Sequence, residues 1–149
     1  KPQYYFSEAY FRKLFNSESF EIDNLFAIHK DSKEVVSSAI MIKTNNIIQY
    51  HLSGTTSDFL DFSPIRLLID ETRIKGSMEG FKYFNLGGGL GSTKDQLFEF
   101  KSSFSKDFKP FELWKYTVNR EVYNKLIEAK NMVLTEDDKG FYPAYRFNE

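Results

Sequence analysis

Three consecutive runs in the first half of the chain alternate between apolar and polar residues, and short polar turns separate them. We predict strands at residues 20–30, 35–44 and 47–53, because period-two alternation bounded by turn residues is typical of half-buried strands. The second turn is Asn45–Asn46, and asparagine tolerates the left-handed backbone of tight turns. Turns this short join antiparallel neighbours, so the pattern predicts an antiparallel meander.

Elsewhere, apolar residues recur at helical spacing. The longest such pattern covers residues 64–79, where Ser63 is placed to cap the helix and Pro64 fits the first helical position. Gly80 fits the helix end. We also predict three shorter helices, one after Ser7, one over residues 94–100 and one after Asn119.

A strand pattern at residues 81–86 follows the long helix directly. A strand–helix–strand connection joins parallel strands, so we expect residues 47–53 and 81–86 to be parallel neighbours. Further strands are predicted at residues 108–118 and, as an edge strand, in the aromatic tail at 141–147. The predicted fold class is therefore α+β, with a mixed central sheet that contains an antiparallel meander and one parallel crossover.

Length and composition narrow the classes of protein. A chain of 149 residues with 41% hydrophobic content suits a single domain with its own core. No apolar run reaches the ~18 residues of a transmembrane helix, and no signal peptide is visible, so we expect a cytoplasmic protein. The absence of cysteine excludes disulfides and thiolate catalysis, and two distant histidines predict no metal site.

The strand at residues 81–86 runs into four glycines within five positions, at 87, 88, 89 and 91. Glycine allows close backbone approach to a ligand, and free N–H groups at a following helix can bind an anion. The same loop can also serve only to turn the chain. It is not a Walker loop, because Lys94 follows threonine rather than glycine, and not a dinucleotide loop, because Ser92 occupies the third glycine position.

The order of elements, together with four short motifs, resembles the FemAB-like branch of the GNAT acyltransferase superfamily, which includes the peptidoglycan aminoacyl transferases. The motifs are Tyr-His-Leu-Ser-Gly at 50–54, the Ser-Pro helix start at 63–64, Tyr-Phe-Asn-Leu-Gly-Gly at 83–88 and Phe-Lys-x-x-Phe at 100–104. Transferases of this branch carry two GNAT domains. The resemblance implies that this chain corresponds to the second, with a companion GNAT domain as a partner.

The resemblance also implies an activity, the transfer of an acyl or aminoacyl group to a small-molecule or peptide amine. The donor would be acyl-coenzyme A or aminoacyl-tRNA, with no further cofactor, bound where the two parallel strands splay apart. The donor-binding residues implied are Ser53, Gly54, Ser63, Gly87, Gly88 and Phe100. Asp58 and Asp61 stand where acetyltransferases carry a basic, glycine-rich loop, so we expect acetyl-coenzyme A to bind weakly.

Three residues are candidates for catalysis. Lys101 matches the lysine of the family motif and would stabilise charge on the donor carbonyl; the alternative is a solvated lysine on an amphipathic helix. His51 would act as a general base, or else as a hydrogen-bonded packing residue. Asn85 stands where relatives carry aspartate. If that aspartate has a structural role, asparagine can replace it; if the aspartate is catalytic, this chain is impaired or is not an enzyme.

Two other functions compete with the transferase. A GNAT-fold domain that binds a ligand or partner without catalysis fits Asn85 and the acidic helix start. A single-stranded nucleic-acid module would use a basic strip with interleaved phenylalanines. That strip consists of Lys94, Lys101, Lys106 and Lys109, and it is interrupted by Asp95, Glu99 and Asp107, which favours a mixed solvated face.

Overall fold

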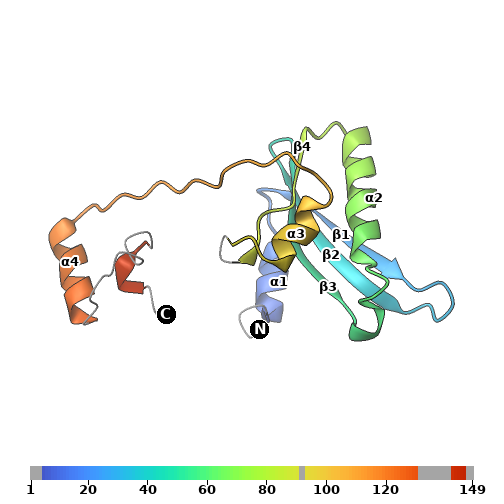
Figure 1. Ribbon diagram of the computed structural model, residues 1–149, viewed down its shortest axis with the longest axis horizontal. Coiled ribbons are helices and arrows are strands. Elements are labelled where there is room, and N and C mark those ends of the chain that lie inside the picture. The colour runs from blue at the N-terminus through green and yellow to red at the C-terminus, as the bar shows by residue number, and fades with distance from the viewer. Residues whose placement is uncertain (1–4, 91–92, 131–141, 147–149) are drawn as a thin grey trace. The chain divides into compact units, whose positions relative to one another are not determined.

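A computed structural model describes residues 5–90, 93–130 and 142–146 (Figure 1). The chain divides into two compact units, one ending at Lys106 and the other beginning at Asp107. Each unit is described by itself.

The first unit is built on a four-stranded mixed sheet. Its strands are β1 (Glu21–Ile28), β2 (Val35–Thr44), β3 (Ile47–Thr55) and β4 (Tyr83–Asn85), and they lie in the order β1-β2-β3-β4. The β1–β2 and β2–β3 pairs are antiparallel, and β3 pairs with β4 in parallel. The predicted meander and the parallel crossover are both confirmed, although β4 is shorter than the predicted strand.

Helix α2 (Ile65–Met78) makes the crossover and packs on one face of the sheet (Figure 1). Its buried residues are Leu68, Ile69, Thr72 and Gly76, and Leu68 joins Met41 and Ile48 of the sheet in the core. Gly76 has a packing role, because a Cβ there would overlap the Cδ1 atom of Ile48. Gly80 ends the helix with a φ of 84°, as predicted.

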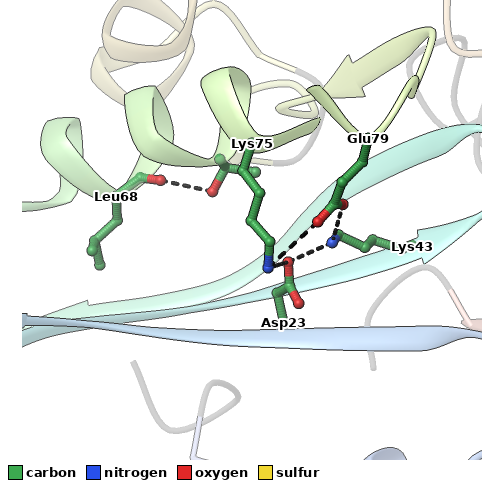
Figure 2. A network of polar contacts seen from close by, with 6 residues as sticks. Asp23, Lys43, Leu68, Lys75 and Glu79 are labelled. Carbon is green, nitrogen blue, oxygen red and sulfur yellow. Dashed lines mark hydrogen bonds and ion pairs between the residues drawn. The ribbon is translucent and has the colours of Figure 1, made fainter. Parts of the chain in front are cut away.

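A buried lysine ties α2 to the meander (Figure 2). Lys43 of β2 is 6% exposed, and its Nζ lies 2.6 Å from both Asp23 Oδ2 and Glu79 Oε2. Lys75 Nζ lies 2.9 Å from the same Asp23 oxygen. The core therefore contains a charge network in which each buried charge has an opposite partner, as burial requires.

Two short helices complete the first unit. Helix α1 (Glu8–Phe15) begins after Ser7, whose Oγ accepts a hydrogen bond from the Tyr10 N–H, as predicted. Helix α3 (Gln96–Ser102) begins after Asp95, whose Oδ1 accepts from the Phe98 N–H at 2.9 Å. It lies two residues later than the predicted 94–100, because Asp95 provides the cap.

The predicted cap at Ser63 is wrong. Ser63 has a φ of 48°, and its hydroxyl donates to the Leu60 carbonyl at 3.4 Å. A capping serine needs extended backbone to reach the N–H groups of the first turn, so the left-handed Ser63 cannot do so. Pro64 occupies the cap position without a side-chain hydrogen bond, and the helix begins at Ile65.

The second unit contains α4 (Arg120–Ala129), which begins with the predicted Asn119 cap. The predicted strand at residues 108–118 is wrong: the segment forms no sheet ladder. Of the predicted tail strand, 142–146 is described, and it contains the 3₁₀ turn Ala144–Arg146; Phe141 and Phe147 lie outside the described residues. Alternation alone does not make a strand, because the ladder needs a partner.

Candidate functional site

The parallel pair separates after three residue positions. Pairing runs from Ile47 with Tyr83 to Gln49 with Asn85, and β4 ends there while β3 continues to Thr55. In the part of the chain that the structure describes, the β4-side edge of β3 has no strand partner beyond Gln49. The Tyr50 carbonyl in this stretch accepts a hydrogen bond from Gln49 Nε2 at 2.9 Å. Open sheets bind ligands at the carboxyl ends of parallel strands.

The glycine loop begins at this point, and Asn85 holds it in place. The Gly87 N–H donates to Asn85 Oδ1 at 2.9 Å, and Asn85 Nδ2 donates to Gln49 Oε1 at 2.8 Å. Gly87 has a φ of 73°, which favours glycine. Asn85 therefore uses its amide as both acceptor and donor to connect the loop with β3.

Lys101 reaches back from α3 to the same loop. Its Nζ donates to the Gly88 carbonyl at 2.9 Å and lies 5.6 Å from the centre of the Tyr50 ring. A Cβ on Gly87 would lie 3.4 Å from this Nζ, in ordinary van der Waals contact, so Gly87 lies directly beside the ammonium. Burial lowers the pKa of Lys101, and the negative charge of Asp95 opposes that shift.

Tyr50 extends the group along β3. Its hydroxyl is hydrogen-bonded to Ser53 Oγ, and burial raises the pKa of Tyr50 against the effect of that hydrogen bond. The predicted donor residue Ser53 is thus linked to Lys101 through one aromatic ring. Gly54 is occupied differently, since its carbonyl accepts from Ser37 Oγ of β2 at 2.9 Å.

His51 forms a β-bulge in β3, because the register passes from Met41 opposite Tyr50 to Ile40 opposite Leu52 and skips it. Its Nε2 lies 2.7 Å from the Tyr10 hydroxyl of α1. Burial lowers the pKa of His51, so the imidazole is uncharged at neutral pH. An uncharged imidazole can accept a hydrogen bond from the tyrosine hydroxyl. No recorded contact among the described residues joins His51 to Lys101.

The rings of Phe100 and Phe104 contact a positively charged side chain of the same chain, Arg66, which the sequence analysis missed. The Arg66 guanidinium of α2 lies 5.1 Å from the Phe100 ring centre and 5.5 Å from that of Phe104. Arg66 Nη1 also donates to Ser103 Oγ at 3.4 Å. Phe100 lies in α3 and Phe104 in the turn that follows it, with their ring centres 5.3 Å apart, and their four-residue spacing was the available signal for a cation site.

The structure thus brings together Asn85, Gly87, Gly88, Lys101 and Ser53, and it adds Gln49 and Tyr50 to the group. Phe100 lies beside them and contacts Arg66. In the described ranges, no recorded contact joins His51, Gly54 or Ser63 to this group.

Two further tests concern metals and membranes. No cluster of three or more histidine, aspartate and glutamate side chains suited to a metal ion occurs within residues 5–90, 93–130 and 142–146. Across those same ranges, every helix is too short or too polar to span a bilayer.

We compared the chain with protein-family models, with curated proteins and with solved structures. None of the three comparisons gives a match.

Proposed function

We propose that this chain is an acyltransferase of the FemAB-like branch of the GNAT superfamily and moves an acyl or aminoacyl group to an amine. The observation that carries the proposal is the position of Lys101. Its ammonium is fixed against Gly88 beside the stretch of β3 that β4 leaves uncovered. A donor lying on that edge would place its reacting carbonyl within reach of a fixed positive charge.

Acyl transfer is favoured by a positive charge near the carbonyl oxygen of the donor. The amine nitrogen attacks the donor carbonyl carbon, a C–N bond forms, and negative charge develops on the carbonyl oxygen before the C–O or C–S bond to the leaving group breaks. Lys101 has three N–H donors, of which Gly88 accepts one, so the others can bind that oxygen. The amine loses a proton, and the departing oxygen or sulfur gains one.

The remaining candidates act by positioning. Asn85 holds the loop that holds Lys101, and an amide suits this role as well as a carboxylate would. His51 Nε2 is already hydrogen-bonded to the Tyr10 hydroxyl, so we assign His51 to orienting α1 and β3 rather than to proton transfer. Ser53 sets the Tyr50 ring against which Lys101 rests.

For the donor we propose aminoacyl-tRNA over acyl-coenzyme A. Asp58 and Asp61 lie just before α2, where a coenzyme A pyrophosphate would sit in the implied geometry. Two carboxylates there repel a pyrophosphate, whereas the aminoacyl ester of a tRNA does not need that position. A variant with Asp58→Asn and Asp61→Asn should therefore gain affinity for acetyl-coenzyme A by calorimetry.

The proposal is tested by label transfer. The full chain is incubated with a lysine-containing acceptor peptide and either radiolabelled aminoacyl-tRNA or radiolabelled acetyl-coenzyme A. We expect transfer from aminoacyl-tRNA that is lost in Lys101→Met and kept in Lys106→Met, a matched exposed lysine. If neither donor supports transfer, and native mass spectrometry detects neither donor on the chain, the proposal fails in favour of a non-catalytic binding domain.

A further inference from the structure

Strand β1 forms an open edge of the sheet. The strand order places β2 on one side of it and, in the described part of the chain, no strand on the other (Figure 1). Natural proteins protect such edges with charged side chains, especially lysine, with proline or with a bulge. β1 contains neither lysine nor proline, its charged residues Glu21 and Asp23 lie in its first half, and its register shift comes only between Ala27 and Ile28, at its end. Phe26 is 53% exposed, so both the backbone edge and an aromatic side chain remain available.

A cavity lies beside this edge, between β1 and α2. Its volume is about 480 Å³, and Leu25 of β1 and Leu67 and Leu68 of α2 are its apolar lining residues on the side that faces the helix. The volume is sufficient for one or two large apolar side chains. A strand added to β1 would direct every second side chain toward α2, at a spacing of roughly 6.7 Å, and so into this cavity.

The rim of the cavity carries an unbalanced negative charge. Lys75 lines it, but its Nζ already lies 2.9 Å from Asp23 and 3.7 Å from Glu79. Glu71 also lines the cavity and makes no ion pair among the residues that the structure describes. A ligand that reaches this rim gains from a positive charge opposite Glu71.

We propose that β1 and this cavity bind an extended peptide segment of a partner protein by strand addition. The segment places an apolar side chain in the cavity and a lysine or arginine opposite Glu71, two residues along on the same face. Main-chain hydrogen bonds supply affinity in this mode of recognition, and the alternate side chains supply specificity. A second copy of β1 does not fit these requirements, because β1 carries Glu21 and Asp23 and no basic residue.

The test uses capped peptides that match the eight-residue length of β1. The first alternates threonine with valine and has lysine in place of one central valine; the second has glutamate at that position; the third is the lysine peptide with alternate backbone amides methylated. Amide chemical shifts and hydrogen exchange of residues 21–28 are followed in the full chain. We expect the lysine peptide to protect these amides and to bind roughly fivefold or more tightly than the glutamate peptide.

Variants identify the charge that is responsible. Glu71→Gln should remove most of the preference for lysine over glutamate, whereas Asp61→Asn, an exposed carboxylate on the loop before α2, should leave it unchanged. The methylated peptide should not bind. If no peptide protects the β1 amides at millimolar concentration, the proposal is overturned. It is equally overturned if the chain alone forms a dimer with concentration-dependent protection of β1, because the occupant is then a second copy.

Discussion

Two lysines in the same unit show opposite solutions to the problem of a partly buried ammonium. Lys43 contacts two carboxylates at 2.6 Å, and although burial lowers its pKa, those hydrogen bonds and charges outweigh burial and raise it. Lys101 has a backbone carbonyl as its hydrogen-bond acceptor, and burial lowers its pKa.

The difference separates a structural charge from one that is available to a ligand. The charge of Lys43 is neutralised within the fold, so a further anion gains little from it. The charge of Lys101 is incompletely compensated, so an oxyanion that develops nearby would relieve the cost of its burial. The following predictions test whether these two lysines differ in this way.

The largest effect is expected from Lys43→Met. Breaking a fully buried pair costs about 3–5 kcal/mol. Because Lys75 still contacts Asp23 and Glu79, and because the Glu79 side chain is 36% exposed, we expect a smaller loss, about 2–4 kcal/mol, from urea unfolding. Lys75→Met is the control: it is 51% exposed and should cost under about 1 kcal/mol. Equal losses of unfolding free energy in both variants would show that Lys43 contributes no more to stability than the exposed Lys75.

Lys101→Met should affect activity strongly and stability little, the reverse of what we expect for Lys43→Met. We expect transfer to slow by ~10²–10³, the usual cost of removing one preorganised stabiliser of a developing charge. Stability should change by under about 1 kcal/mol, because methionine keeps most of the apolar stem and removes an ammonium that burial disfavours. Lys106→Met should leave both quantities unchanged. A loss of stability without a loss of rate would make Lys101 a structural residue like Lys43.

The dependence of stability on pH sharpens the comparison further. Burial raises the pKa of Asp23, but Lys43 and Lys75 outweigh it, so the folded-state pKa lies below the ordinary 3.8. The unfolded chain then binds the proton more tightly, and the contribution of Asp23 is full above about pH 5 and is lost as the pH falls through the folded-state pKa.

In Lys43→Met, where one of the two partners of Asp23 is gone, the unfolding free energy should fall less steeply between about pH 5 and about pH 2. Urea titrations at a series of pH values measure this slope. Lys101→Met should keep the wild-type slope in that range, since Lys101 stays protonated throughout it. An unchanged slope in Lys43→Met would mean that Lys75 alone sets the pKa of Asp23.

The smallest effect concerns the His51–Tyr10 contact. We expect the tyrosine hydroxyl to donate to the neutral imidazole, so Tyr10→Phe should remove a bond that favours the uncharged form. The pKa of His51 should rise toward its ordinary 6.5, by under about one unit. An NMR titration of the two histidines measures it, with the His29 signals as an internal reference. A fall in the pKa would show that the imidazole is the donor in this contact.

Sequence reasoning succeeded where local chemistry decides the structure. The caps at Ser7 and Asn119, the asparagine turn and the helix end at Gly80 depend on a few adjacent residues, and the structure has them as predicted. The crossover also followed, since a helix between two strands leaves few connections to choose from. Ser63 was misjudged because the preceding turn, through the Leu60 carbonyl, competes for its hydroxyl.

The residues of the candidate site also divide into those that the sequence identified and those whose role depends on another element. Lys101, Asn85, Gly87, Gly88 and Ser53 are close in the structure, and the sequence singled out all five. Tyr50 and Arg66 were missed as members of the site, because each gains its role from a side chain on another element. For His51 the sequence left open a general base and a hydrogen-bonded packing residue, and only the structure identifies its hydrogen-bond partner, Tyr10, 41 residues away in the chain.

The sequence by itself determined the order of helices and strands in the first unit and the presence of one parallel crossover, because these depend on short-range periodicity and turn chemistry. Only the tertiary structure decided how the two lysines differ. Lys43 and Lys101 are the same residue type, and their pKa values move in opposite directions because Asp23 and Glu79 outweigh burial at Lys43, whereas burial dominates at Lys101. Coulomb energies depend on distance in space, and sequence spacing does not supply it.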